Sequence, residues 1–262
     1  MAPMAPCPDP GATDGRQTRI APRPTMTVCI TGASQGIGAA MARAFAAEPG
    51  ARVALVARSE GALNAVAADC RALGAAAGVF PCDVTDPDAV GAMAAAVQDA
   101  LGVPGVLVNN AGHFAPGGFA ETEPETFAAQ LAVNLTSAFL VTRAFLPAML
   151  ARGADGGEPG RVLFTGSVAS VQGYPGGTAY CAAKHGLLGL ARALRAETLG
   201  AGLAVTTLLP GATLSPSWDG ADVAPERLMP AEDLARLAVE VCRMSPRSVV
   251  EEVLVRPRHG DL

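Results

Sequence analysis

Short apolar runs rich in β-branched residues alternate with longer alanine-rich segments along the chain from residue 25 onward. The short runs lack regular polar alternation, which is typical of strands buried on both faces of a sheet, and the longer segments have the length of helices. This alternation predicts repeated βα units on a parallel sheet. We expect strands at 27–31, 52–57, 78–80, 105–109, 161–165, 204–209 and 249–255, and helices at 37–47, 60–73, 87–101, 123–151, 178–199 and 230–243.

Seven strands separated by helices, without an internal repeat, predict an α/β fold with a doubly wound, Rossmann-type parallel sheet and helices on both faces. A chain of 262 residues fits one large domain, which we place at 25–262. Ligands of such sheets bind outside the carboxyl ends of the strands. The irregular stretch at 211–229 follows one of these ends, and we expect it to be a mobile substrate lid.

The first 24 residues are rich in proline and contain no apolar stretch of the kind that a secretory signal needs. We predict a disordered arm there, with Met26 as a candidate physiological start. The six cysteines include no C-x-x-C pair, so we expect reduced thiols of a cytoplasmic protein and no metal site.

Charge and hydropathy exclude two other classes of partner. The net charge is −5 and the arginines form no basic run, so we expect no nucleic-acid partner. The most apolar long stretch, 131–150, is interrupted by Asn134 and Arg143. It therefore falls short of the roughly 18 uninterrupted apolar residues of a membrane span, and we expect none.

A glycine-rich turn follows the first predicted strand and leads directly into a helix. Gly32 and Gly36 let the backbone approach a pyrophosphate without Cβ clashes, and Gly38 lets the helix pack closely on the strand. The helix N-terminus offers unpaired N–H groups to the anion. The candidate cofactor residues of this turn are Gly32, Ser34, Gln35, Gly36, Ile37 and Gly38.

The end of the second strand selects between the two nicotinamide dinucleotides. An acid there binds the ribose 2′-hydroxyl of NAD, whereas arginine accepts the 2′-phosphate of NADP. This chain has Arg58 and Ser59 at that point and no acid before Glu60, which favours NADP(H), with NAD(H) as the alternative. Asp83 and Val84 follow the third strand, where Asp83 is placed to accept a hydrogen bond from the adenine amino group.

Tyr180 and Lys184 lie four residues apart in a predicted helix, so their side chains share one face about one turn apart. Lys184 is the only lysine in the chain. A neighbouring cation favours a phenolate, so we expect Lys184 to lower the pKa of Tyr180 and make it a usable proton donor and acceptor.

Further motifs stand in a fixed order around this pair. They are the T-G-x-x-x-G-x-G turn, N-N-A-G at 109–112, Ser167 with twelve residues between it and Tyr180, and Pro210-Gly211. Together they make the chain from Met26 onward resemble a classical short-chain dehydrogenase/reductase.

The resemblance implies that Tyr180 protonates the substrate carbonyl oxygen, Ser167 polarises that carbonyl and Lys184 holds the nicotinamide ribose. Asn134 would order a water linked to Lys184. The resemblance further implies a homodimer or homotetramer, and it adds the cofactor residues Asn110, Ala111, Gly112, Pro210, Gly211 and Thr213.

Candidate substrate residues are mostly apolar, and they are His113, Phe114, Val168, Tyr174 and Trp218. They favour an NADP(H)-dependent reductase of a ketone or aldehyde with apolar substituents. Alternatives are a 3-oxoacyl thioester reductase acting on a carrier-bound substrate, an NAD-dependent alcohol dehydrogenase, and a non-catalytic NADP-binding sensor. Ser167, Asp219 and His259 have the chain order of a hydrolase triad, but the serine lacks the G-x-S-x-G elbow.

Overall fold

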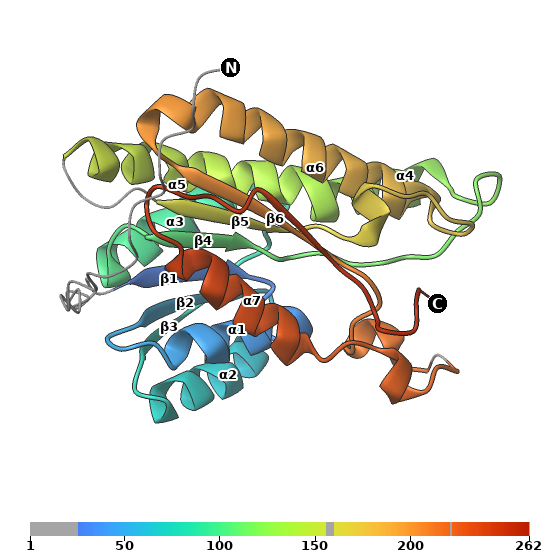
Figure 1. Cartoon of the computed structure of the whole chain (residues 1–262), viewed down its shortest axis with the longest axis horizontal. Helices are drawn as coiled ribbons and strands as arrows, with labels where there is room; N and C mark the ends of the chain where they lie inside the picture. The colour runs from blue at the N-terminus through green and yellow to red at the C-terminus, as the bar shows by residue number, and fades with distance from the viewer. Residues whose placement is uncertain (1–25, 156–159, 221, 262) are drawn as a thin grey trace, which may run out of the picture.

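The computed structural model describes residues 26–155, 160–220 and 222–261 (Figure 1). Its centre is a parallel sheet in the order β3-β2-β1-β4-β5-β6-β7, which confirms the predicted α/β fold class. The expected arm at 1–24 lies outside the described residues. The strands are β1 (Thr27–Thr31), β2 (Arg52–Ala57), β3 (Ala76–Pro81), β4 (Val106–Asn109), β5 (Arg161–Thr165), β6 (Ala204–Pro210) and β7 (Glu252–Val255).

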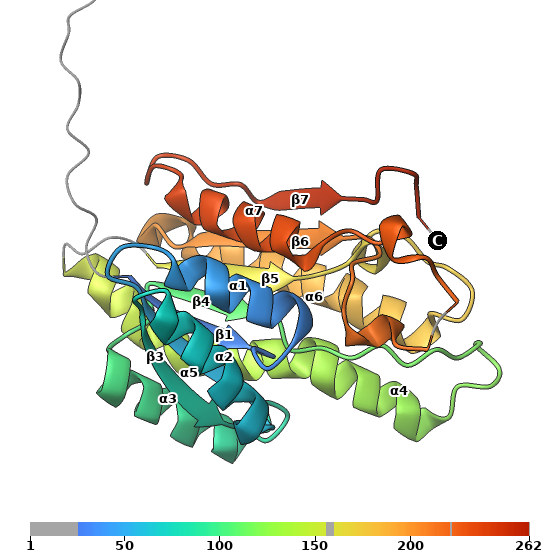
Figure 2. The ribbon, with the colours of Figure 1, turned by 90° about the horizontal axis from the view of Figure 1, so that it is seen from below.

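The sheet is covered by helices on both faces (Figures 1 and 2). One layer consists of α1 (Gly36–Ala46), α2 (Glu60–Ala72) and α7 (Ala231–Arg243). The other consists of α3 (Pro87–Leu101), α4 (Pro124–Leu131), α5 (Ser137–Ala154) and α6 (Thr178–Thr198). Every parallel connection crosses one face or the other, so the carboxyl ends of all seven strands share one edge.

Each face of the sheet has its own apolar core. Met41 and Phe45 of α1 pack with Ile30 and Leu55 on one face. On the other face the fully buried Phe145 of α5 belongs to a second cluster. Full burial of a side chain of this size stabilises the fold by roughly 1.5–3 kcal/mol. The central strands are therefore apolar on both sides, which explains their lack of polar alternation.

The predicted helix at 123–151 differs from the structure in one respect. It is divided into α4 and α5 by a π-helical turn, Ala132–Thr136, which carries Asn134. The hydroxyl of Ser137 donates to the carbonyl oxygen of Val133 at 2.7 Å, beside the wider turn. Such turns insert one residue into a helix and rotate the following side chains, which hydrophobic spacing alone does not reveal.

Two strand predictions need correction. The strand predicted at 78–80 extends over Ala76–Pro81, all paired with β2. The strand predicted at 249–255 is only Glu252–Val255, because pairing with β6 begins at Glu252. Its β-branched start at Val249 and Val250 lies outside the ladder, although the Val250 carbonyl accepts a bond from the Thr206 hydroxyl at 2.7 Å.

The predicted lid at 211–229, described except for residue 221, forms two short helical turns, Pro216–Trp218 and Pro225–Arg227. Its ends are joined where Leu214 donates to Met229 and Met229 donates to Ala212, at 2.8 and 2.9 Å. The segment is thus a closed loop whose base is tied to the end of β6. Its mobility stays a prediction.

One helical run among the described residues, Pro124–Ala154, is long and apolar enough to cross a membrane by length and composition. Core helices of water-soluble proteins pass the same test, which makes it weak evidence. The run is interrupted by the π-helical turn and packs against α3 and α6.

Candidate active site

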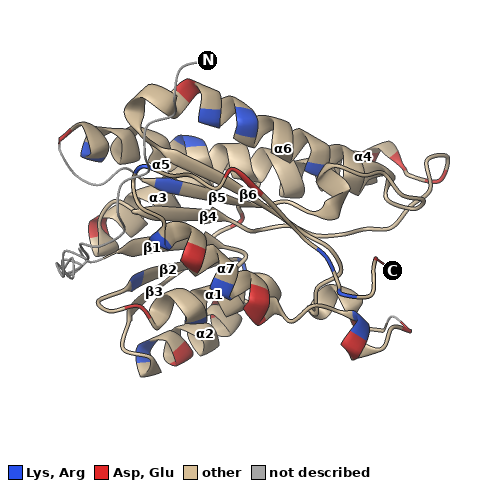
Figure 3. Cartoon of the chain, in the orientation of Figure 1, with Lys and Arg blue, Asp and Glu red and all other residues tan. Residues whose placement is uncertain are grey.

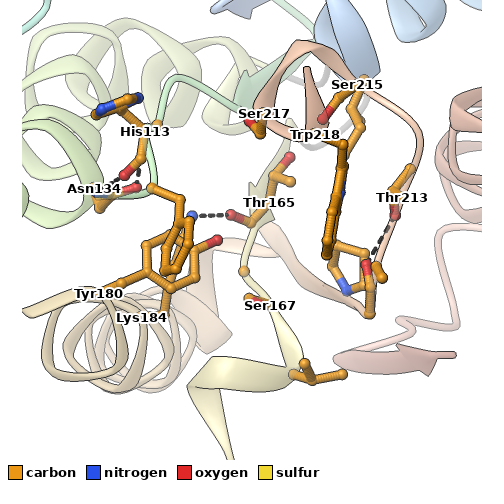
Figure 4. Close-up of a pocket in the computed structure, with 18 of the residues that line it drawn as sticks. His113, Asn134, Thr165, Ser167, Tyr180, Lys184, Thr213, Ser215, Ser217 and Trp218 are labelled. Atoms are coloured by element: carbon orange, nitrogen blue, oxygen red, sulfur yellow. Dashed lines mark hydrogen bonds between the residues drawn. The ribbon is translucent and has the colours of Figure 1, made fainter. Parts of the chain in front are cut away.

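A cavity of about 450 Å³ lies at the carboxyl ends of β4, β5 and β6. All four predicted catalytic residues and all five predicted substrate residues line it. Figure 4 shows Tyr180, Lys184 and Asn134 on one side and Thr213, Ser215 and Trp218 on the other. The size is that of a site for a small organic molecule, which typically occupies 300–1,000 Å³. Predicted catalytic and substrate residues spread over positions 113 to 218 thus come together in one cavity.

Tyr180 projects from α6 into this cavity. Its ring stands edge-on to Phe114, with the centroids 5.2 Å apart and the planes at 81°. Loss of hydration raises the pKa of Tyr180 to about 12, while its hydrogen bond with the Ser167 hydroxyl acts in the opposite direction. The side chain is therefore a neutral phenol at neutral pH, in the form that can donate a proton.

Lys184 lies one turn further along α6 and is buried. Its Nζ donates to the carbonyl oxygen of Thr165 at 2.8 Å and lies 5.5 Å from the centroid of the Tyr180 ring. Burial lowers the pKa of Lys184 to about 8. The prediction that this ammonium lowers the pKa of Tyr180 is wrong here, because the cavity disfavours both charged forms and burial dominates for each group.

Ser167 follows β5 and begins a short helical turn, Val168–Ser170. Its hydroxyl oxygen accepts from the Ala169 N–H at 3.1 Å, and the Ser170 hydroxyl oxygen accepts from the Ser167 N–H at 3.2 Å. This reciprocal cap fixes the backbone and the side chain of Ser167 together. The same hydroxyl takes part in the hydrogen bond with Tyr180, so the two hydroxyl groups lie together in the cavity.

Asn134 is buried in the π-helical turn and is bonded on both sides of its amide. Its Oδ1 accepts from the His113 N–H at 3.2 Å, and its Nδ2 donates to the His113 carbonyl at 2.8 Å. Nδ2 also lies 3.2 Å from the side-chain oxygen of Gln130, a buried residue that the sequence analysis missed. A methyl group on Gly112 would lie 2.7 Å from Asn134 Oδ1 and 3.6 Å from Lys184 Nζ. Asn134 therefore ties the loop after β4 to the floor of the cavity.

The glycine turn has the geometry expected of a phosphate cradle. Gly32 and Gly36 have φ of +65° and +53°, which glycine adopts without strain. A Cβ on Gly38 would lie 2.2 Å from the Gly32 carbonyl oxygen, so only glycine fits. No side chain caps the N-terminus of α1 at Gln35, which leaves that helix end open to an anion. These features fit a dinucleotide cofactor, with Ser34 and Ile37 in the same turn.

Asn110 and Thr31 hold this turn in place. Asn110 Nδ2 donates to the carbonyl oxygens of Thr31 and Gly32 at 3.1 and 3.3 Å. The Thr31 hydroxyl oxygen accepts from the N–H groups of Asn110 and Ala111, both at 3.0 Å. Thr31 was missed in the sequence analysis, although it is the first residue of the glycine motif. Asn110 thus braces the cradle, and it also lines the cavity.

Arg58 and Asp83 follow neighbouring strands, since Ala57 pairs with Pro81. Hydrogen bonds from Thr85 and, more weakly, the charge of Arg58 hold the pKa of Asp83 below its usual range. Ser59 caps α2 by accepting from Ala62, and Val84 is buried. These predicted cofactor residues lie outside the cavity, along the same sheet edge.

The rest of the cavity wall follows β6. Pro210, Gly211 and Thr213 line it, and the buried Thr213 hydroxyl donates to the Gly211 carbonyl at 2.9 Å. Gln172 and Asp261 also line the cavity and were missed, because both lie in irregular segments without a periodic pattern. The hydrolase candidates Asp219 and His259 do not line it. The described residues bring no three His, Cys, Asp or Glu side chains together as a metal site requires.

A family model described as short chain dehydrogenase matches residues 26–223. The chain belongs to this family. It is therefore an oxidoreductase that acts on CH–OH groups and their carbonyl counterparts, as the sequence resemblance implied.

Individual relatives agree with this assignment. The chain is 31% identical to a sepiapterin reductase of Chlorobaculum tepidum over 240 residues, which cover 89% of this chain and 96% of the relative. An alcohol dehydrogenase of the archaeon Thermococcus sibiricus, complexed with 5-hydroxy-NADP, has a TM-score of 0.83 and 26% identity, covering 91% and 99% of the two chains. A variant of the actinorhodin polyketide ketoreductase with NADPH has a TM-score of 0.81 and 29% identity, covering 91% and 98%.

Proposed function

We propose that this short-chain dehydrogenase is an NADP(H)-dependent carbonyl reductase that converts a ketone or aldehyde with apolar substituents into an alcohol. The observation that carries the proposal is the placement of the Tyr180 phenol beside the Ser167 hydroxyl and the Lys184 ammonium in a cavity of small-molecule size. Apolar and aromatic walls at Phe114, Val168 and Trp218 suit apolar substituents.

The chain's own residues supply the proton and the oriented dipoles. NADPH, when bound, supplies the hydride. Tyr180 donates a proton to the carbonyl oxygen, because its phenol is protonated at neutral pH. Ser167 donates a hydrogen bond to the same oxygen and stabilises the charge that develops there. Lys184 would hold the nicotinamide ribose, and Asn134 fixes the loop after β4 through His113.

The assignment of NADP(H) as cofactor rests on residues at the carboxyl ends of the strands. The glycine turn and the open end of α1 would hold the pyrophosphate, and Arg58 with Ser59 would hold the 2′-phosphate. Asp83 Oδ1 is engaged by Thr85, which leaves the second carboxylate oxygen for the adenine amino group. Three solved relatives are described as complexes with NADP or NADPH, in support of this choice.

A carrier-bound 3-oxoacyl thioester is the alternative substrate, since a solved relative is a polyketide ketoreductase. An acidic carrier protein would need a basic docking face. In Figure 3, basic and acidic residues are interspersed, including at the 211–229 segment, where Arg227 follows Glu226. This favours a free small molecule over a carrier-bound one.

We also expect a cytoplasmic homo-oligomer. In the part of the chain that the structure describes, Cys29, Cys70, Cys82 and Cys181 are free thiols, which suits a reducing compartment. Phe139 on α5 is about half exposed, and apolar surface on the long helices suits contact with a second copy. Sedimentation as a monomer at micromolar concentration would contradict the oligomer.

The test follows NADPH oxidation by absorbance against ketones, diketones, aldehydes and 3-oxoacyl thioesters, with NADH in parallel. Tyr180→Phe should abolish turnover and leave NADPH binding nearly intact. Arg58→Asp should weaken NADPH binding far more than NADH binding. Turnover retained by Tyr180→Phe would refute its role, and a silent panel despite NADPH binding would favour the sensor alternative.

A further inference from the structure

The segment that follows β7, residues 256–261, lies beside the 211–229 segment in both views (Figures 1 and 2). Gly211 donates to the Val255 carbonyl at 2.7 Å, and Pro257 is buried. A Cβ on Gly211 would lie 2.9 Å from Pro257 Cδ and 3.2 Å from Asp261 Oδ1. The bare glycine therefore lets this segment seat directly on the end of β6, where the cavity opens.

Arg256 connects two walls of the cavity. One arm of its guanidinium forms an ion pair with Asp261 Oδ2, and Nη2 donates to the side-chain oxygen of Gln172 at 3.1 Å. Gln172 and Asp261 both line the cavity, and Gln172 lies shortly after the turn that carries Ser167. A single arginine thus fixes the positions of a carboxylate and a carboxamide that lie far apart in the sequence.

Among the described residues that line the cavity, Asp261 is the only carboxylate. Its Oδ2 is bound by Arg256, so Oδ1, on the Gly211 side, retains its capacity to accept a hydrogen bond. The side chain is 28% exposed, so a ligand group can reach it. A carboxylate oxygen held in place accepts from hydroxyl and amino groups and repels anions.

We propose that Asp261 selects substrates that carry a hydroxyl or amino group away from the reacting carbonyl, and that Arg256 positions it. The inference rests on the proposed function, because it concerns the far end of the same substrate. It narrows the substrate class to ketones or aldehydes with an apolar body and a hydrogen-bond donor. Substrates with a carboxylate or phosphate at that end are disfavoured.

The test compares 3′-hydroxyacetophenone, acetophenone and 3-acetylbenzoate, which share one reacting ketone. Their dissociation constants are measured by calorimetry on NADP⁺-saturated enzyme, where no reduction occurs, and their kcat/KM by NADPH oxidation. Asp261→Ala removes the acceptor and leaves Arg256 unpaired beside the cavity. Asp219→Ala makes the same charge change on the 211–229 segment, off the cavity, and is the matched control.

The unmodified enzyme should bind the hydroxyl ketone about tenfold more tightly than acetophenone, because the charged acceptor adds a hydrogen bond. It should bind the benzoate most weakly, because the two carboxylates repel each other. Asp261→Ala should lose the preference for the hydroxyl ketone over acetophenone and should bind 3-acetylbenzoate most tightly of the three. Asp219→Ala should behave like the unmodified enzyme. Arg256→Gln should raise KM for the hydroxyl ketone without lowering kcat, because it only positions Asp261.

The two proposals fail in different ways. Selectivity that is unchanged in Asp261→Ala, or no detectable binding of the hydroxyl ketone, overturns the role of Asp261 even where ketones are reduced. Binding that follows Asp261 without reduction of any ketone supports the role of Asp261 and refutes the reductase.

Discussion

Replacing Lys184 with methionine should stabilise the folded protein at neutral pH while it weakens cofactor binding. Methionine has a similar length and no charge, and Lys184 is only 3% exposed. Among the described residues, its Nζ donates to one acceptor, the Thr165 carbonyl oxygen, at 2.8 Å. Loss of hydration destabilises the folded state at a buried ammonium with one acceptor by more than that single hydrogen bond stabilises it.

The magnitude follows from the lowered pKa. A change from 10.5 to about 8 on folding corresponds to about 3 kcal/mol against folding at neutral pH, since a tenfold change in proton affinity is worth about 1.4 kcal/mol. The substitution also removes the hydrogen bond to Thr165, which offsets roughly 1 kcal/mol of this gain in stability. Lys184→Met should therefore raise the free energy of unfolding by about 2 kcal/mol at pH 7.

The pH dependence has a definite sign. Below pH 8 the folded and unfolded forms both carry the ammonium, so the penalty is complete. Between pH 8 and 10.5 the folded form loses its proton first, and the unmodified protein gains stability as pH rises. The advantage of Lys184→Met should therefore shrink over this window.

The assay is guanidinium unfolding without cofactor, followed by circular dichroism at pH 7 and pH 9.5. Arg143→Met, a cation-to-methionine change at an exposed site of α5, is the control and should change stability little. A Lys184→Met protein that is less stable at pH 7, or whose advantage is the same at both pH values, would refute this account of the buried lysine.

Three further predictions concern the cradle and the cavity floor. Gly38→Ala should cost about 1–3 kcal/mol of stability and abolish NADPH binding, because its methyl group would lie 2.2 Å from a carbonyl oxygen of the glycine turn. Gly61→Ala is the control, because the space around Gly61 is open, and it should be neutral or stabilising in thermal melts. Gln130→Leu should lower kcat several-fold with little change in the Kd of NADPH, because Asn134 loses a partner; an unchanged kcat would remove Gln130 from the site. The Kd of NADPH should rise above about pH 8 as Lys184 loses its proton, and this dependence should be absent in Lys184→Met.

The parts of the site that the sequence predicts are those whose geometry one element determines. Tyr180 and Lys184 share a helix face because of their spacing, and both line the cavity. Ser167 and the glycine turn are placed by the rule that parallel strands end at one edge. The presence of each strand could likewise be predicted from its own apolar run. The limits of the strand at 252–255, in contrast, depend on its pairing with β6.

The residues that escaped prediction depend on contacts between distant segments. Gln130 is the exception, because it lies four residues before Asn134 on the same helix face, a spacing that the sequence does show. Asp261 reaches the cavity because Gly211 has no side chain, and Gly211 was interpreted as part of a cofactor motif alone. Gly211 thus belongs to the Pro210-Gly211 motif and also leaves room for Pro257 and Asp261, and only the motif can be recognised in the sequence.

The electrostatics of the catalytic pair were mispredicted for a related reason. Spacing shows that the lysine and the tyrosine are neighbours, but it does not show how much water surrounds them. Burial in the cavity lowers the pKa of Lys184 and raises that of Tyr180, so each group disfavours its charged form. A protonated phenol is what carbonyl reduction requires of a proton donor. The same burial that defeats the simple ion-pair argument therefore keeps Tyr180 in the form that can donate a proton.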